Sequence, residues 1–366
     1  MLCGRMDVLA AAEVKMKNDL NGSKVKKTNK EKWIIRNRFF AGRMIPVVSA
    51  DLNFSDIIGG WKVRWGINRN DYRVNPGIYS LGNPDDKADV LVTANYKLTF
   101  DKLRKELKGM NLWILVLDTD GVNVWCAAGK GTFGTDELIS RIKSSGLERI
   151  VSHKRLILPQ LGAPGIESHI VKEKSGFNAV FGPVYAKDIK RFFENGYRKD
   201  DRMRTVRFGL TERMAVSPIE LVLAAKYIIA FSAIFGIFSF ISEKNFSVQM
   251  FNNTFPILAA FITGIFIFPA FLPFIPFRSF SIKGALLGAA VSLGLSFYLG
   301  EDVSGYISNF VFTVPIVSFF ALNFTGATTF TSLSGVQLEF KYGIPVMLVF
   351  GISGIVLKTL DIFPVI

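Results

Sequence analysis

The order of hydrophobic and polar positions divides the 366-residue chain into two parts. Before residue 218, short apolar runs rich in β-branched residues alternate with amphipathic runs, at about thirty residues per pair. This spacing is typical of βα crossovers and predicts a mainly parallel, Rossmann-like α/β sheet. After residue 218, long apolar runs separated by short loops predict an all-α, multi-span transmembrane domain of about five helices.

Four strand–helix units are expected in the first part. The predicted strands are residues 88–94, 112–118, 148–152 and 178–183, and the helices that follow them are residues 100–107, 136–144, 166–174 and 186–195. Because the carboxyl ends of parallel strands meet at one edge of a sheet, the four strand-to-helix turns should converge there. Ligands of open α/β sheets bind at that edge, so these turns form the candidate site.

The same patterns set the expected domain boundaries. We expect a basic N-terminal segment at 1–50, the α/β domain at 51–200, a basic linker at 201–218 and the transmembrane domain at 219–366. The five predicted spans are residues 219–241, 255–277, 282–299, 306–324 and 343–360. A polar segment, residues 323–340, separates the last two spans. It is either a flexible connector or a platform that docks the soluble domain.

Composition supports a membrane protein. A formal charge of +14 together with a positive mean hydropathy is typical of basic membrane proteins and unusual for soluble domains. The basic stretch 15–43 fits either contact with lipid headgroups or a solvated tail. No nucleic-acid-binding motif accompanies it, so no nucleic-acid partner is expected.

The distribution of charge predicts the orientation in the membrane. Residues 1–20 contain no uninterrupted hydrophobic stretch followed by a cleavage site, so we expect no secretory signal. Arg278, Lys283 and Lys341 then fall in cytoplasmic loops, whereas the loop with Glu301 and Asp302 falls outside, as the positive-inside rule expects. The prediction is a multi-pass protein of the cytoplasmic (inner) membrane with its soluble domain on the cytoplasmic side.

Cys126 is the candidate reactive residue. The chain contains only two cysteines and two histidines, which excludes a disulfide framework, an iron–sulfur cluster and a histidine metal cage. Cys126 follows a predicted strand, near a helix start and Lys130, where a thiol is biased toward thiolate. Its neighbours Ala127, Ala128 and Gly129 predict a shelf that a flat ligand can approach. The alternative is a buried structural cysteine.

The glycine-rich stretch GKGTFGT follows Cys126. It matches neither of the nucleotide-binding patterns GxxxxGK[ST] and GxGxxG, and we expect no dinucleotide site there. Backbone binding of a phosphate at Gly129, Gly131 and Thr132 remains possible.

Four ordered strings carry a resemblance to a known family. They are TANYKLTFDKLR, LDTDGVNVWCAAGKGTFGTDEL, VSHKRLILPQLGAPGIESHIVKEKSGF and FGPVYAKDIKRFF, within about residues 63–198. This part resembles the corrinoid-binding domain shared by the large subunit of the corrinoid iron–sulfur protein and the corrinoid protein of microbial mercury methylation (the HgcA family). The former also carries a cysteine-rich cluster domain, which this sequence does not show, whereas NVWCAAGK followed by membrane spans resembles the latter.

The resemblance implies a base-off, cobalamin-type corrinoid with Cys126 as the catalytic residue and lower axial ligand of cobalt. The DxHxxG signature of histidine-ligated cobalamin domains is missing, which agrees with sulfur in that place. Asn123 should cap the helix that carries Cys126, and Trp125 should brace it. The expected corrinoid contacts are Thr93, Asn95, Tyr96, Asn123, Val124, Trp125, Ala127, Ala128, Gly129, Lys130, Gly131, Thr132, Gly134, Thr135, Gln160, Leu161, Gly162, Ala163, Pro164, Gly165, Gly182 and Pro183.

The implied activity is transfer of a methyl group from methyl-cobalt to Hg(II), giving methylmercury. The partners implied with it are a small, ferredoxin-like iron–sulfur reductant with two clusters, a methyltetrahydrofolate-type methyl donor, Hg(II) as a thiolate complex, and membrane lipid. Two alternatives stay open at this point. One is a membrane-anchored corrinoid methyl carrier for another acceptor, of the acetyl-CoA-pathway type, and the other is a non-catalytic corrinoid-binding protein for uptake or storage.

Overall fold

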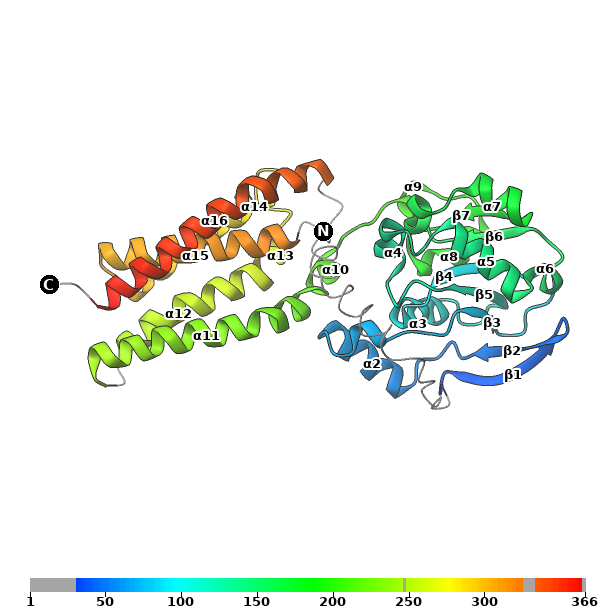
Figure 1. The fold of residues 1–366 in the computed structure, drawn as a ribbon, viewed down its shortest axis with the longest axis horizontal. Helices are drawn as coiled ribbons and strands as arrows, with labels where there is room; N and C mark the ends of the chain where they lie inside the picture. Colours follow the sequence, from blue (N-terminus) through cyan, green and yellow to red (C-terminus); the bar gives the residue numbers. More distant parts are fainter. Residues whose placement is uncertain (1–30, 246–247, 325–332, 364–366) are drawn as a thin grey trace, which may run out of the picture. The chain divides into compact units, whose positions relative to one another are not determined.

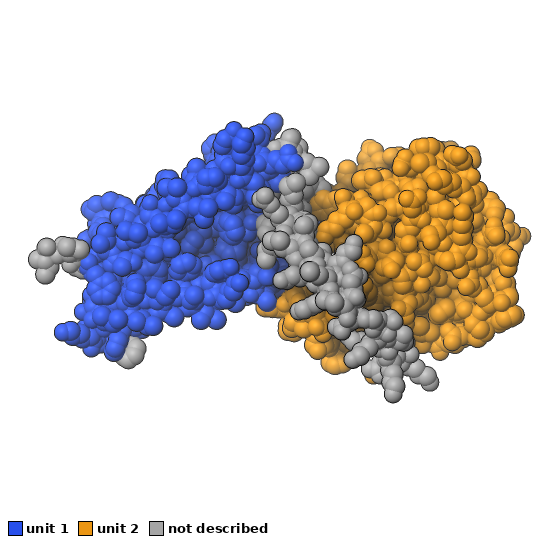
Figure 2. Space-filling model, in the orientation of Figure 1, with its two compact units in different colours: residues 1–19, 207–366 blue, residues 20–206 orange. Residues whose placement is uncertain are grey.

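The computed structural model describes residues 31–245, 248–324 and 333–363. They form two compact units: the residues up to 206 make one, and those from 207 onward make the other (Figure 2).

The first unit is built on a seven-stranded mixed sheet (Figure 1). Its order is β1-β2-β3-β5-β4-β6-β7. Strands β5, β4, β6 and β7 run parallel, whereas β3 pairs antiparallel with β5, and β1 and β2 form an antiparallel pair. The strands are β1 (Ile34–Phe40), β2 (Arg43–Val48), β3 (Gly77–Leu81), β4 (Val90–Ala94), β5 (Leu112–Leu117), β6 (Arg155–Leu158) and β7 (Asn178–Phe181).

Helices cover both faces of this sheet. The side chains of β5 alternate between two cores, with Leu115 on one face and Ile114 on the other. Helices α5 (Thr135–Ser145) and α7 (Ser168–Ser175) pack on the first face, and α3 (Lys97–Glu106) and α8 (Ile189–Glu194) pack on the second. The expected α/β architecture, followed by a helical region, is confirmed.

Most of the predicted elements of this unit are present, and one predicted strand is wrong. Residues 148–152 do not form a strand, because Leu147–Ile150 is the short helix α6. The strand is β6, which begins at Arg155. Leu147 and Ile150 lie three positions apart and are both buried, which suits one helical turn. Gly146, at φ +60°, ends α5 immediately before it.

Residues 34–48 belong to the sheet. The segment 1–50 was expected to be a basic N-terminal segment outside the α/β domain, but β1 and β2 lie within it, and β2 pairs with β3. The pattern was missed because β1 has the sequence IIRNRFF, in which charged and apolar residues do not alternate strictly. The remaining short elements of this unit are α2 (Phe54–Arg64), η1 (Arg69–Asp71), α4 (Val124–Lys130), η2 (Gln160–Gly165), η3 (Ala186–Asp188) and α9 (Asp201–Arg204).

In the second unit, five described helical stretches are long and apolar enough to span a membrane. They are Leu210–Glu243, Val248–Phe271, Phe280–Leu299, Val303–Phe324 and Gly335–Ile362, which confirms the expected multi-span region. The first contains α10 (Leu210–Met214) and α11 (Ser217–Glu243), and the second contains α12 (Val248–Ile262), the π-helical turn η4 (Thr263–Ile267) and α13 (Phe268–Phe271). The third and fourth are α14 (Phe280–Leu299) and α15 (Val303–Phe324), and the fifth lies within α16 (Leu333–Ile362).

Small residues allow α14 and α15 to approach closely. Gly284, Gly288, Ser292 and Ser296 recur at every fourth position of α14 and are all buried. A methyl group on Gly284 would lie 2.5 Å from the Ala321 side chain, so the backbones meet without intervening side chains. Such small-residue seams are how helices associate in lipid, where burial of apolar surface gives no net driving force.

The polar segment 323–340 is in part helical. Helix α16 begins at Leu333, ten residues before the predicted start of the last span, while residues 325–332 lie outside the described part. Glu339 accepts hydrogen bonds from the backbone nitrogens of Phe280 and Ser281, at 3.2 and 2.9 Å. A carboxylate at a helix N-terminus pairs with its unsatisfied N–H groups, so this part of the segment anchors α14.

A polar cluster at the ends of three spans was not expected from the sequence. Lys358 of α16 is buried, donates to Asn309 Oδ1 at 2.9 Å and pairs with Asp361 at 3.5 Å. Asn309 in turn donates to Ser296 of α14 at 3.1 Å. Burial raises the pKa of Glu301, in the loop between α14 and α15, and the nearby charge of Lys358 opposes this.

Candidate functional site

The candidate site lies at the carboxyl edge of β4, β5 and β6. The chain leaves β4 toward β5 on one side and later returns to β6 on the other side of β4, so the strand order changes direction there. Such a switch point leaves a crevice outside the strand ends, where open α/β sheets bind ligands. The turns after β4, β5, β6 and β7 all contain predicted site residues, and contacts between these turns bring them together.

Asn95 joins the turn after β4 to the turn after β5. Its buried side-chain oxygen accepts hydrogen bonds from the Thr119 backbone nitrogen at 3.1 Å, the Thr119 hydroxyl at 2.8 Å and the Gly121 backbone nitrogen at 2.9 Å. Its side-chain nitrogen donates to Asp118 Oδ1 at 2.9 Å. These bonds within the protein position the loop that leads into α4. That Asn95 contacts a corrinoid stays a prediction.

Helix α4 carries Cys126 and has well-defined ends. Asn123 is its N-cap, and the Asn123 Oδ1 atom accepts from the Cys126 backbone nitrogen at 3.0 Å, which confirms the predicted cap. Gly131 ends the helix in the left-handed conformation, at φ +83°. The seven-residue helix therefore holds Cys126 in its first turn, with the backbone around it fixed at both ends.

The exposure of α4 corrects the interpretation of its small residues. Ala127 and Ala128 are 0% and 6% exposed and belong to the hydrophobic core, so they do not form an open shelf. Trp125, expected to brace the helix, is exposed instead. The accessible side of α4 consists of Trp125, the partly exposed residue Cys126, Gly129 and Lys130.

Helix α4 and η2 pack closely together, and small residues lie at this contact. A side chain at Gly165 would come within 3.2 Å of the Ala128 Cα atom and would also collide with the Phe133 carbonyl oxygen. Similarly, a side chain at Gly162 would lie 2.5 Å from the buried Phe133 ring. Glycines in the turn after β6 therefore let it pack directly on α4.

The turn after β7 completes the edge. The Gln160 backbone nitrogen donates to the Pro183 carbonyl oxygen at 3.5 Å, and Lys199 donates to the Gln160 side-chain oxygen. Burial lowers the pKa of Lys199, and the positive charge of Arg204 lowers it further. Gln160 and Pro183 were predicted from the sequence, whereas Lys199 was not.

Tyr96 interacts electrostatically with Cys126. Burial raises the pKa of the Tyr96 hydroxyl, the charges of Arg69 and Arg64 oppose this rise, and the charge of Cys126 adds to it. Tyr96 also forms a β-bridge with Arg73. These three arginines were not predicted as site residues, because they lie before β4 and outside the strand-to-helix turns. The paired aromatic and basic residues at 61–73 were the only available signal.

The other predicted residues divide into packing positions and accessible positions. Thr135 accepts a hydrogen bond from the Glu167 backbone nitrogen at 2.8 Å. Gly134 is the N-cap of α5, and a side chain there would come within 2.5 Å of the Gly131 carbonyl oxygen. Thr132 has a buried hydroxyl with no hydrogen-bond partner among the described residues. The buried positions are Thr93, Val124, Gly162, Gly182 and Pro183, and the wholly or partly accessible ones are Gln160, Leu161, Ala163, Pro164 and Gly165.

The residues present are compatible with a flat tetrapyrrole-type ligand such as a corrinoid. A soft sulfur donor lies on the accessible side of α4, and a methyl group at Gly129 or Gly131 would meet no atom within 4 Å. The unpartnered Thr132 hydroxyl can hydrogen-bond a polar substituent at the rim of such a ligand. The donor set of a single thiol suits a metal whose other ligands come from a macrocycle.

Comparison with known proteins gives a partial match. Residues 63–193 match the family model CdhD, described as CO dehydrogenase/acetyl-CoA synthase delta subunit. The chain is 31% identical over 133 residues to the acetyl-CoA decarbonylase/synthase complex subunit gamma of Methanocaldococcus jannaschii, covering 36% of this chain and 27% of that protein. The corresponding subunit of Methanothermobacter thermautotrophicus is 32% identical over 128 residues, covering 34% and 28%.

A third relative, the same subunit of Methanopyrus kandleri, is 29% identical over 128 residues, covering 34% of this chain and 27% of the relative. The chain thus spans between a quarter and a third of the length of these curated relatives. The family match ends before α10, so the five candidate spans lie outside it. Residues 63–193, which include the candidate site, are therefore similar to subunits of CO dehydrogenase and acetyl-CoA synthase complexes.

Proposed function

We propose that this protein is a membrane-anchored, corrinoid-dependent methyltransferase that transfers a methyl group to Hg(II), with Cys126 as the lower axial ligand of cobalt. The observation that carries the proposal is the position of Cys126. Its thiol lies on the accessible side of a capped helix at the switch point of the sheet, within the residues similar to acetyl-CoA decarbonylase/synthase subunits. The five apolar helices support membrane anchoring.

The protein's own residues have three tasks in this proposal. Cys126 offers a thiolate sulfur, Asn123 fixes the helix turn that carries it, and Asn95 fixes the loop before that helix. Gly129, Gly131 and Thr132 leave space and a hydroxyl for the rim of the ligand. A base-off corrinoid bound there would supply a cobalt ion that carries the methyl group and releases it with both bonding electrons, after which it needs re-reduction.

The partners follow from this chemistry. Hg(II) is the substrate, presented as a thiolate complex, because soft metal ions are bound by sulfur in cells. We propose a small, ferredoxin-like protein with two iron–sulfur clusters as the reductant and a methyltetrahydrofolate-type compound as the methyl donor. The distribution of Lys and Arg among the loops supports a location in the cytoplasmic membrane with the α/β unit on the cytoplasmic side.

A second candidate function is a corrinoid methyl carrier for another acceptor, of the acetyl-CoA-pathway type. The similarity to acetyl-CoA decarbonylase/synthase subunits favours it specifically. Both functions need the same site, and they differ in the acceptor.

One experiment tests the proposal and separates the two candidates. The full-length protein is expressed anaerobically with cobalamin, purified in detergent and examined by absorption spectroscopy. It is then loaded with a methyl group and offered a Hg(II)–thiolate complex or a nickel-containing acetyl-CoA synthase preparation. Corrinoid binding with methylmercury formation supports the proposal. Transfer only to the synthase supports the second candidate, and a folded protein without corrinoid contradicts both.

A further inference from the structure

Helix α2 exposes three large apolar side chains and buries a carboxylate. Phe54, Ile57 and Trp61 occupy one face at helical spacing and are 78%, 56% and 55% exposed. On the opposite side, Asp56 is buried together with Gly60 and Val63. A surface helix usually packs on the core through such an apolar stripe, whereas this stripe faces away from the core.

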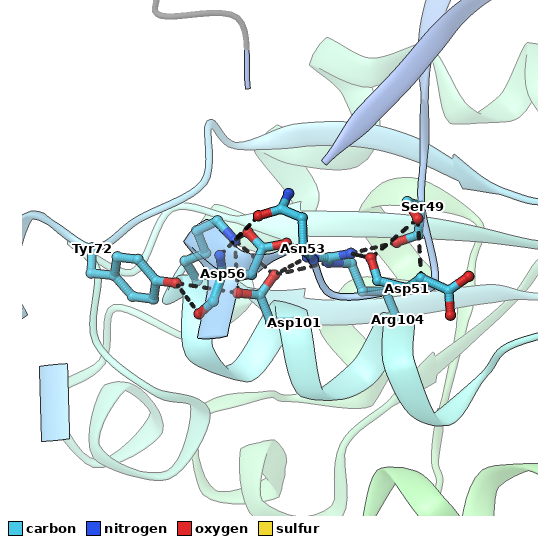
Figure 3. Close-up of polar contacts among 8 residues, drawn as sticks. Ser49, Asp51, Asn53, Asp56, Tyr72, Asp101 and Arg104 are labelled. Carbon is cyan, nitrogen blue, oxygen red and sulfur yellow. Dashed lines mark hydrogen bonds and ion pairs between the residues drawn. The ribbon is translucent and has the colours of Figure 1, made fainter. Parts of the chain in front are cut away.

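A buried ion-pair network holds α2 in this orientation (Figure 3). The Asp56 carboxylate accepts from Lys97 Nζ at 2.7 Å and from Arg104 Nη2 at 2.6 Å, both on α3. The same two cations bind Asp101, at 2.7 and 2.8 Å. Two carboxylates and two cations balance in charge. Turning the apolar face of α2 inward would leave Lys97 and Arg104 buried beside a single carboxylate, which is costly.

Asn53 adds a second restraint on the orientation. Its side chain accepts from the Asp56 backbone nitrogen at 3.0 Å, while the Asp56 carboxylate accepts from the Asn53 backbone nitrogen at 3.1 Å. This reciprocal capping box fixes the first turn of α2. The exposed apolar face is thus built into the fold by specific polar contacts.

The surroundings of this face are aromatic and basic. The Trp61 and Trp65 rings pack with their centroids 5.6 Å apart, and Lys62 and Arg64 in the last turn are exposed. Just beyond the helix, Ile67 is also exposed. Tryptophan beside Lys and Arg on an amphipathic helix is the composition of helices that lie in the headgroup region of a membrane.

We propose that the α2 face, defined as Phe54, Ile57 and Trp61 with Lys62 and Arg64, inserts into the headgroup region of the bilayer that the same chain spans. Only five residues, Thr205 to Gly209, connect α9 to the first candidate span. Fully extended, they reach about 20 Å, so the α/β unit cannot move far from the membrane surface. The basic residues favour anionic lipid. This proposal does not depend on the proposed function.

Tryptophan fluorescence tests the docking, because all five tryptophans lie at positions 33–125 and the spans contain none. In full-length protein carrying Trp65→Phe and Trp125→Phe, Trp61 is the only exposed tryptophan, since Trp33 and Trp113 are buried. The protein is reconstituted into phosphatidylglycerol-containing vesicles with or without lipids brominated near the headgroup. We expect brominated lipid to quench the emission, and Ile57→Asp to reduce this quenching at least twofold.

Two controls make the result specific. Phe39→Asp changes an apolar residue on β1 that is more exposed than Ile57, and it should leave the quenching unchanged. Vesicles of phosphatidylcholine alone should give weaker quenching, and equal quenching in both lipids would contradict the role of the basic residues.

Aqueous acrylamide distinguishes the other outcomes. Free access of acrylamide to Trp61 without bromine quenching would overturn the proposal, because the face would then be solvated. Protection from acrylamide without bromine quenching would overturn it as well, because protein instead of lipid would then cover the α2 face.

Discussion

The side-chain oxygen of Asn95 accepts a hydrogen bond from the backbone nitrogen of Gly121 at 2.9 Å, across 26 positions of sequence. Gly121, at φ +73°, turns the chain toward α4. The same oxygen also binds Thr119. One buried amide thereby connects the end of β4 to the helix that carries the candidate reactive thiol.

Asn95→Ala should therefore lower both stability and corrinoid binding. It removes the acceptor of two buried backbone N–H groups, and each unsatisfied group costs about 1–3 kcal/mol. Thermal unfolding of the purified protein and corrinoid titration measure the two effects. Asn178→Ala, at an exposed asparagine of β7, is the matched control. An unfolding temperature equal to that of wild type would contradict the bracing role of Asn95.

Cys126→Ala should abolish methyl transfer to Hg(II) with little effect on folding. Cys126 is partly exposed and lies outside the core clusters, so we expect a change of less than about 0.5 kcal/mol in unfolding free energy. Methylmercury formation and the absorption spectrum of bound corrinoid are the measurements. Cys3→Ala is the control and should behave as wild type. Equal rates for both variants would exclude sulfur ligation by Cys126.

Gly129→Ala and Ala128→Leu should have opposite effects on stability. A methyl group at Gly129 meets no atom within 4 Å, and alanine is favoured over glycine in a helix by up to about 1 kcal/mol. Leucine at buried Ala128 overpacks the contact with Gly165 and should cost about 1–3 kcal/mol.

Corrinoid titration of Gly129→Ala tests the position of the ligand. If the ligand lies on the accessible side of α4, Gly129→Ala weakens corrinoid binding while stabilising the protein. A Gly129→Ala protein with unchanged corrinoid affinity would place the ligand elsewhere on the edge.

The network around Asp56 should make the α/β unit sensitive to acid. Burial alone would raise the pKa of Asp56, but hydrogen bonds and charge from Lys97, with Arg104 and the Asn53 backbone, outweigh it and hold the pKa below its ordinary value of 3.8. The stabilisation is therefore present above about pH 4 and is lost as the pH falls through the lower pKa of the folded state.

Asp56→Asn tests this dependence. Loss of one member of a buried ion-pair network costs about 3–5 kcal/mol at neutral pH. Unfolding followed by tryptophan fluorescence between pH 7 and pH 3 should show a less stable variant with a flatter pH profile than wild type. Asp71→Asn, at an exposed carboxylate, is the control. Parallel pH profiles for wild type and Asp56→Asn would show that another group governs the acid response.

Lys358→Met should destabilise the membrane-spanning unit. The substitution leaves Asp361 without its buried cation, and such a change costs about 3–5 kcal/mol. Thermal aggregation in detergent measures the loss. Lys341→Met, at an exposed lysine of the same helix, should have little effect. Similar aggregation temperatures for the two variants would mean that water, instead of Lys358, solvates Asp361.

Local patterns in the sequence predicted the features that depend on neighbouring residues. The apolar runs of β4 and β5 and the Asn123 cap are of this kind, because a strand core or a cap is encoded within a few positions. The role of Asn95 could not be predicted, since its partners are 23 to 26 residues away. Its buried amide was therefore interpreted as a ligand contact.

The small residues of α4 and the apolar residues of α2 show the same limit of local patterns. The alanines after Cys126 indicated open space, but both are buried, and η2 packs closely on Ala128 through Gly165. The spacing of Phe54, Ile57 and Trp61 is that of a buried stripe, yet these side chains are exposed and Asp56 is buried, with cationic partners more than forty positions later. Residue size and polarity give the periodicity of a face, whereas its direction depends on distant partners.

Strand β1 has a consequence for crowding in the plane of the membrane. It ends the sheet within the described residues, and it carries Arg36 and Arg38 next to a register irregularity. Proteins confined to two dimensions meet edge to edge far more often than proteins free in solution. Charged side chains and an irregular outer strand deter one sheet from extending into the next, so this edge should keep neighbouring copies from polymerising.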